Sequence, residues 1–186
     1  MKKRKFRKFA GLFLMLLAVF VQGMVFERVQ GEEPASVVTI GEVSAILAEP
    51  ENLEKESERA VIIENARAGQ VIRRTPTVYL LEESKRAYVR AMISVSGLSG
   101  GQAQKVLGSL EWPQGWNYNL KDGYYYYKDS ISAGQQVPVF ESIHIPEDWK
   151  NPGRFQIDVR VEVVQASSLT PKIDAECRIL EWILAE

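Results

Sequence analysis

The clearest pattern in the chain is a strict alternation of apolar and polar residues between positions 155 and 163. The apolar members are Phe155, Ile157, Val159, Val161 and Val163. The polar members between them are Gln156, Asp158, Arg160 and Glu162. A period of two is typical of a strand with one face in a hydrophobic core and the other in water. The pattern therefore predicts a half-buried β-strand.

Residues 89–95 repeat this alternation, and less regular apolar runs predict further strands. We expect these at residues 37–47, 71–81, 124–127 and 137–145. Turn-forming sequences with glycine separate them, such as Lys121-Asp122-Gly123. Short strands at this spacing are typical of an all-β protein, so the sequence predicts an antiparallel β-sandwich over residues 37–186.

Two short helices are expected to interrupt the strands. The first covers residues 102–110. The second covers residues 171–184 near the C-terminus, where Thr170 can cap the helix and Pro171 suits its first turn. Its apolar positions are Ile173, Ile179, Leu180, Ile183 and Leu184. Residues 49–59 are rich in charge and predict an exposed loop.

The N-terminus predicts export. Six basic residues between Lys2 and Lys8 precede the apolar stretch 10–21, which is shorter than the roughly 18 to 20 residues of a membrane span. We expect a signal peptide over residues 1–23, cleaved between Gly23 and Met24, followed by an extended segment, residues 24–36. An uncleaved anchor over residues 9–26 is the alternative, and it would be the chain's only contact with a membrane.

Removal of the signal makes the chain acidic. The sequence has 23 Lys and Arg residues against 24 Asp and Glu residues, and six of the basic residues precede Gly23. A mature chain with this excess of acidic residues is a poor partner for nucleic acid, because phosphate binding needs a basic surface. We expect a secreted protein or one on the extracellular cell surface.

Cysteine and histidine provide little for catalysis. Cys177 is the only cysteine, so it is either a small buried side chain or a thiol that links two chains. His144 is the only histidine and lies in a predicted strand, and neither a zinc-binding motif nor a nucleophile motif is present. We therefore expect no catalytic residue, no metal ligand and no cofactor, although residues 49–58 could supply oxygen ligands to calcium.

Aromatic residues form the second conspicuous group. These are Trp112, Trp116, Tyr124, Tyr125, Tyr126 and Tyr127. Consecutive tyrosines on a strand present two rings to each face. One pair can form a surface platform for a carbohydrate or a partner strand, or the rings can make ordinary cross-strand pairs.

Several short motifs occur in the same order as in a known family. They are Val38-Thr39-Ile40-Gly41-Glu42-Val43, Pro76-Thr77-Val78, Ala87-Tyr88-Val89-Arg90, Trp116 followed by Asp122-Gly123-Tyr124-Tyr125-Tyr126-Tyr127, Ala133-Gly134, Val139-Phe140, and Val163-Val164-Gln165-Ala166. Over residues 37–182 the chain resembles the TasA-like and camelysin-like exported proteins of Gram-positive bacteria, which a SipW-type signal peptidase processes. The resemblance implies a jelly-roll sandwich at the cell surface. It also implies assembly into biofilm matrix fibres by donation of an N-terminal strand, or a camelysin-type metallopeptidase activity.

The leading functional expectation is a non-enzymatic fibre subunit or matrix component. The partners would be copies of the chain itself or related matrix proteins. A sandwich that lacks one edge strand exposes unpaired backbone groups, which a segment of another chain can pair with. The candidate assembly residues are Val25, Phe26, Val38, Ile40 and Val43. The alternatives are an extracellular metallopeptidase and a carbohydrate- or host-binding module.

Overall fold

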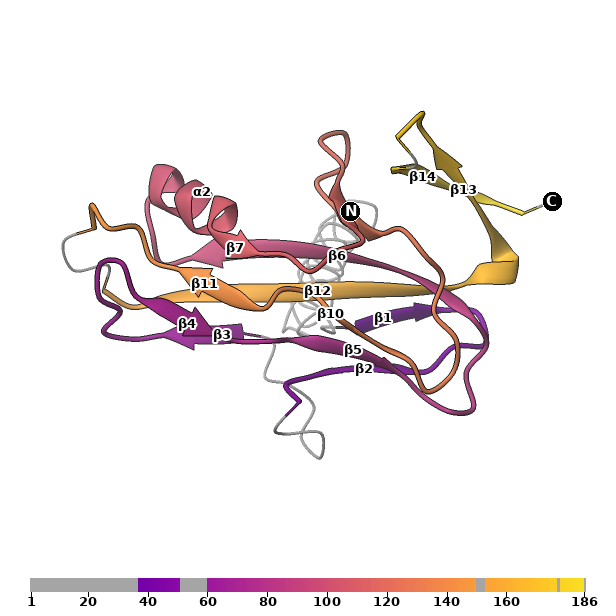
Figure 1. Ribbon diagram of the computed structural model, residues 1–186. Coiled ribbons are helices and arrows are strands. Elements are labelled where there is room, and N and C mark those ends of the chain that lie inside the picture. Colours follow the sequence, from indigo (N-terminus) through magenta and orange to yellow (C-terminus); the bar gives the residue numbers. More distant parts are fainter. Residues whose placement is uncertain (1–36, 51–59, 150–152, 177, 186) are drawn as a thin grey trace, which may run out of the picture. The chain divides into compact units, whose positions relative to one another are not determined.

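Two long antiparallel strands at the centre of the fold carry the predicted alternation. In the computed structural model, which describes residues 37–50, 60–149, 153–176 and 178–185, they are β6 (Ala87–Ser96) and β12 (Phe155–Gln165). Residues 156–165 of β12 all pair with β6 (Figure 1). The apolar residues of β12 are buried, as the period of two predicts.

Four further strands complete the sheet around this pair. Its order is β1-β12-β6-β9-β8, and β3 also pairs with β12. The added strands are β1 (Val37–Ile40), β3 (Ala60–Ile63), β8 (Trp116–Tyr118) and β9 (Tyr125–Tyr127). β1 runs parallel to β12, so the expectation of a purely antiparallel fold is wrong at this pair.

Two three-stranded sheets face this sheet across the hydrophobic core. One has the order β10-β5-β2 and the other the order β4-β11-β7. Their strands are β2 (Ala45–Ala48), β4 (Val71–Arg73), β5 (Thr77–Leu80), β7 (Leu110–Glu111), β10 (Gln136–Pro138) and β11 (Ser142–His144). The core joins buried side chains of both layers, for example Val161 and Val89 with Val78 and Ile143. The described residues therefore form an all-β, sandwich-like fold.

Three of the predicted strands are each divided in two. Residues 37–47 form β1 and β2, because Gly41 at φ +92° turns the chain between them. Residues 71–81 form β4 and β5, and residues 137–145 form β10 and β11. The predicted strands at 89–95, 124–127 and 155–163 correspond to β6, β9 and β12. The first helix is confirmed as α2 (Gly100–Gly108), which begins after Ser99.

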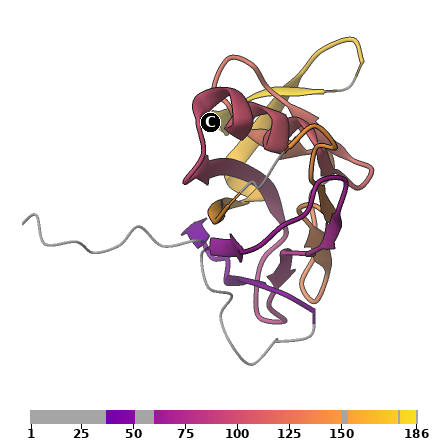
Figure 2. The ribbon, with the colours of Figure 1, turned by 90° about the vertical axis from the view of Figure 1, so that its left-hand side faces the viewer.

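The second predicted helix, residues 171–184, is wrong. After the 3₁₀ turn η2 (Ala166–Ser168), the chain forms a hairpin of β13 (Leu169–Ile173) and β14 (Ile179–Leu184). Asp174 favours this turn because its Oδ1 accepts the backbone N–H groups of Glu176 and Arg178. The hairpin, yellow in Figures 1 and 2, stands above the long strands. Cys177 lies outside the described residues.

Other expectations also lie outside the part of the chain that the structure describes. They concern the signal peptide, the cleavage site at Gly23 and Met24, the segment 24–36, and most of the loop 49–59. Within the described ranges, no helix is both long and apolar enough to span a membrane.

Candidate functional site

One side of β12 is covered by two short strands rather than by one long strand. β3 pairs with residues 155–158 in the antiparallel direction, and β1 pairs with residues 161–164 in the parallel direction. The two strands therefore follow one another along the same side of β12 (Figure 1). Among the described residues, β1 lies at the edge of the sheet, and no described strand pairs with its outer backbone groups in that sheet.

The side chains of β1 are only loosely packed. Val37 contacts the core, and Val38 is half-buried beside Glu162 in the register with β12. Thr39 is exposed, and Ile40 keeps 51% of its surface in water. Little apolar burial therefore holds β1 on β12. Of the predicted assembly residues, Val38 and Ile40 lie on this edge strand, and Val25 and Phe26 lie outside the described residues.

Behind β1 the chain is fixed firmly. A side chain at Gly41 would lie within 2.7 Å of Gln165, so glycine fits this close approach as well as the positive φ. The Glu42 N–H donates to Oε1 of Gln165 at 2.8 Å, and the Ser44 N–H donates to Oγ of Ser84 at 2.8 Å. Val43, the fifth predicted assembly residue, is buried in the core. Residues 41–44, which follow β1, are thus held to the rest of the fold by their own hydrogen bonds.

The outer face of the large sheet contains a connected group of charged and aromatic side chains. Arg90 and Glu162 lie directly opposite one another on β6 and β12. Nε and Nη2 of Arg90 both donate to Oε2 of Glu162, at 2.8 and 2.6 Å. Tyr124 donates to Oε1 of Glu162 at 2.7 Å, and Tyr126 donates to Oδ2 of Asp122 at 2.6 Å. We call these five residues the Arg90 network.

Burial and hydrogen bonds shift the ionisation of this network. Burial favours the neutral form of Glu162, but the hydrogen bonds from Tyr124 and Arg90 outweigh it and lower the pKa of Glu162. Burial likewise opposes the charge on Arg90, and its hydrogen bonds to Glu162 and Tyr126 raise its pKa overall. For Tyr126, burial and the hydrogen bond to Asp122 raise the pKa to about 12. Arg90 and Glu162 are therefore both charged at neutral pH.

The C-terminal hairpin covers the Arg90 network. The Trp182 ring lies 4.8 Å from the Arg90 guanidinium carbon and 5.3 Å from the ring of Tyr126. Tyr124 stacks on the same guanidinium at 4.0 Å. Cation–π contacts of this kind compensate a charge that has lost part of its water. In the described part of the chain, the buried indole Nε1 of Trp182 has no hydrogen-bond partner.

The six aromatic residues of the predicted platform lie on two different faces. Tyr124 and Tyr126 belong to the Arg90 network. Trp112, Trp116, Tyr125 and Tyr127 gather with Tyr118 on the core side of β8 and β9, at the edge of the sandwich. Trp112 and Tyr125 stack at 3.8 Å, and Tyr118 meets Tyr125 at 4.7 Å. Because these rings pack against one another, they agree with the alternative of ordinary cross-strand aromatic pairs rather than with an open surface platform.

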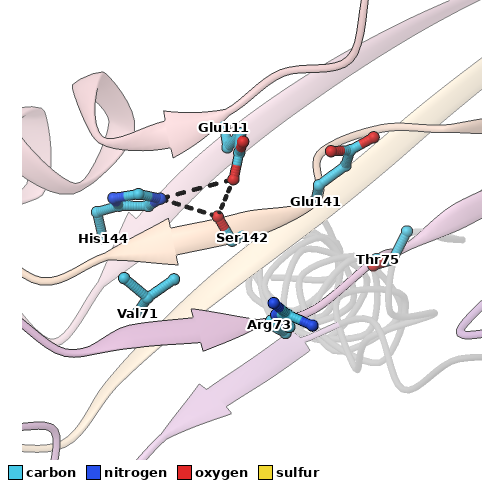
Figure 3. A pocket seen from close by; sticks show the side chains of 7 residues that line it. All are labelled: Val71, Arg73, Thr75, Glu111, Glu141, Ser142 and His144. Carbon is cyan, nitrogen blue, oxygen red and sulfur yellow. Dashed lines mark hydrogen bonds and ion pairs between the residues drawn. The ribbon is translucent and has the colours of Figure 1, made fainter.

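A polar cavity of about 480 Å³ lies on the other layer of the fold (Figure 3). It is lined by Val71, Arg73, Thr75, Glu111, Glu141, Ser142 and His144. Ser142 donates to Oε2 of Glu111 at 2.6 Å, and Nε2 of His144 lies 3.0 Å from Oγ of Ser142. The same nitrogen is 3.6 Å from Oε2 of Glu111. The hydrogen bond from Ser142 is the main cause that lowers the pKa of Glu111.

This geometry differs from that of a serine nucleophile. In a hydrolytic triad the histidine stands between the serine and the acid and uses one nitrogen for each. Here Nε2 of His144 faces both partners, and the Ser142 proton is directed to Glu111. Among the described residues no three His, Cys, Asp or Glu side chains come close enough to hold a metal ion.

The sequence did not identify Arg90, Glu162 or Asp122 as interacting residues. Glu162 occupies a polar position of the alternating strand, which predicts exposure, but only 6% of its surface is exposed, and its carboxylate is bound by Arg90 and Tyr124. One residue in the local sequence indicates that this face of β12 is covered: Val164, which is apolar and lies on the same face two positions later. A scan against protein-family models, a search of curated proteins and a search of solved structures each found no match to this chain.

Proposed function

We propose that the protein is an exported, non-enzymatic structural protein at the cell surface, the subunit of an extracellular matrix fibre of the TasA-like kind. In this proposal the strands follow a jelly-roll order, and subunits join when the N-terminal strand of one copy occupies the sheet edge of the next. The observation that carries the proposal is β1: a short, half-exposed, parallel strand at the edge of β12, joined to the core through an anchored turn.

Strand exchange requires little change in interactions. β1 makes the same backbone hydrogen bonds to residues 161–164 whether it comes from the same chain or from a neighbour. Its side chains bury little surface, so its release costs little. The anchors at Glu42 and Ser44 keep the remaining fold in place while β1 extends outward. An exchange in which each copy donates to the next continues indefinitely and forms a filament.

The other polar sites have structural explanations that agree with this proposal. The Arg90 network joins β6, β9 and β12 and lies beneath Trp182, so it stabilises the sheet that receives the donated strand. In the cavity lined by His144, Glu111 accepts a hydrogen bond from Ser142, and the lowered pKa of Glu111 makes it a weak base for activating that hydroxyl. Stabilisation of the fold is therefore enough to explain these contacts, and no catalytic reaction is needed to account for them.

Deletion of the N-terminal strand tests the proposal. The mature chain, residues 24–186, should form filaments visible by electron microscopy. A chain that begins at Gly41 should remain monomeric by light scattering and keep the circular dichroism of a folded β protein. A synthetic peptide of residues 24–40 should bind this shortened chain, because the edge of β12 is then open.

A chain that begins at Val37 is the matched control, because it keeps β1 but lacks the preceding segment. If the Gly41 chain still forms filaments, exchange of β1 is wrong. If the mature chain stays monomeric over a wide range of concentration and pH, the fibre function itself is wrong, and binding to carbohydrate should then be measured.

A further inference from the structure

The polar cavity beside Ser142 has charges of opposite sign on its two sides. It lies on the outer face of the sheet β4-β11-β7, where the three strands place Arg73, Ser142 and Glu111 in one row. Residues directly opposite one another in antiparallel strands point to the same face of the sheet. Arg73 and Glu111 therefore stand two strand spacings apart, about 10 Å between backbones, with Ser142 between them (Figure 3).

Part of the charge in this cavity is not used by contacts within its lining. The hydrogen bonds and the ion pair drawn in Figure 3 join Ser142, Glu111 and His144, and none of them reaches Arg73 or Glu141. Glu111 uses Oε2 for these contacts, so its Oε1 still faces solvent without a partner among the lining residues. The hydrogen bond from Ser142 is the main cause of the lowered pKa of Glu111, and the charge of Arg73 adds to it from across the cavity.

We propose that this cavity binds a small basic amino acid, whose α-carboxylate pairs with Arg73 and whose two cationic groups pair with Glu111 and Glu141. A volume of about 480 Å³ is sufficient for a molecule of this size. Val71, which is 51% exposed at one end of the cavity, gives the methylene groups of the ligand an apolar contact. This function goes beyond fibre assembly, because β4, β7 and β11 take no part in the exchange of β1.

The charges of the lining decide between classes of ligand. Two carboxylates repel a phosphate or another polyanion, and the guanidinium of Arg73 repels a simple polycation. A sugar ring would find no aromatic side chain to pack against in the described lining. Two carboxylates and one guanidinium are matched by a molecule with two cationic groups and one carboxylate, which is the charge pattern of a free basic amino acid.

The lone histidine provides a direct test of binding. His144 lines the cavity and is the only histidine of the chain, so its imidazole protons report occupancy in a one-dimensional NMR spectrum without further assignment. The probe is L-lysine, titrated into the soluble fraction of the mature chain at constant pH and ionic strength. The imidazole signals should shift and reach saturation in the millimolar range, because exposed ion pairs each contribute modestly.

Related molecules and variants make the test specific. L-alanine lacks the second cation and should bind more weakly, and L-glutamate should produce no saturable shift. Arg73→Gln and Glu141→Gln should each weaken the binding of L-lysine by about threefold or more. Glu83→Gln and Arg86→Gln are the matched controls, because both residues are exposed and neither lines the cavity. They should leave the titration unchanged, and the dispersion of the spectrum reports that each variant is folded.

Three results would overturn the inference. The first is a shift that grows linearly with all three amino acids, which is a general effect of added solute. The second is an affinity for L-lysine that neither Arg73→Gln nor Glu141→Gln changes. The third is equal binding of Nα-acetyl-L-lysine, which lacks the α-ammonium group and would assign the cavity to the C-terminal lysine of a peptide instead. Filaments on electron microscopy grids test the fibre function separately, so either proposal can fail without the other.

Discussion

Strand β12 has two neighbours that are attached very differently. On one side β6 pairs with residues 156–165 in the antiparallel direction, and the side chains between this pair and the opposite layer are buried. On the other side β1 pairs with residues 161–164 in the parallel direction, and its last two side chains are exposed. Strand β12 is therefore firmly packed against β6 and only weakly held by β1.

The difference shows how one sheet can be both stable and able to exchange a strand. The β6 side combines a long ladder, an apolar core and the ion pair between Arg90 and Glu162. The β1 side has a short ladder and little buried surface. Loss of an interaction on the first side should destabilise the fold, whereas loss on the second should change assembly while the fold remains.

Glu162→Gln should give the largest effect on stability. The substitution removes a buried charge and leaves Arg90 partly buried without its partner, which should cost about 3 kcal/mol in the free energy of unfolding at pH 7. Because the pKa of Glu162 is lowered in the folded state, this contribution is present above about pH 4. It disappears as the pH falls through the folded-state pKa. Urea unfolding measures both effects.

Asp158→Asn is the matched control for this prediction. Asp158 lies on the same strand and the same face, and its side chain accepts a hydrogen bond from the neighbouring Gln156. Its substitution should change stability by less than about 1 kcal/mol. Equal losses for the two variants would show that the Arg90 network does not strengthen the β6 side.

Tyr126→Phe should produce the next largest effect. It removes the hydroxyl group that bonds Asp122 and Arg90, at a cost of about 1 to 2 kcal/mol. Because the folded-state pKa is raised to about 12, the tyrosine stabilises the fold below about pH 10, and this contribution is lost as the pH rises through 12. When the tyrosines are titrated by absorbance, the step near pH 12 should be absent in this variant. Tyr118→Phe, at an exposed position, should leave that step in place.

Thr39→Pro should have the smallest effect on stability and a complete effect on assembly. Proline lacks the N–H group and restricts φ to about −65°, so it weakens an extended, paired β1 wherever that strand lies. We expect a loss of about 1 kcal/mol or less, since Thr39 is exposed, together with the absence of filaments. Ile62→Pro is the control on β3, the other short strand on this side of β12. The proposed difference between β1 and β3 would be contradicted if Thr39→Pro still formed filaments. It would also be contradicted if only Ile62→Pro failed to form them.

The period of two predicted β6 and β12 because both faces of these strands follow a regular rule over many residues. The C-terminal hairpin was missed because its apolar residues fit a helix nearly as well as a strand. Two contacts far apart in the sequence decide between the alternatives: Trp182 on Arg90, and the carbonyl oxygen of Leu180 on Asn119. Local propensity does not contain this information.

The candidate site shows the same limit. Val38 and Ile40 were predicted from their place in an apolar N-terminal run, and they lie on the edge strand. The turn that follows β1 at Gly41 packs against Gln165, at the far end of β12, and this contact between residues far apart in the sequence is not visible in the local pattern. The four tyrosines were singled out as a platform, but the structure divides them between two faces because alternate residues of a strand point to opposite sides.

Cross-linking between β1 and β12 tests strand exchange most directly. Ile40 and Val164 are paired in the register, and neighbouring strands bring paired Cα atoms into the range that a disulfide requires. In a mature chain with Ile40→Cys, Val164→Cys and Cys177→Ser, oxidised filaments should give a ladder of covalent oligomers on a non-reducing gel. The same ladder should be absent when the chain is oxidised as a dilute monomer. Filaments that yield only single chains with an internal disulfide would contradict the account, because β1 would then remain on its own β12.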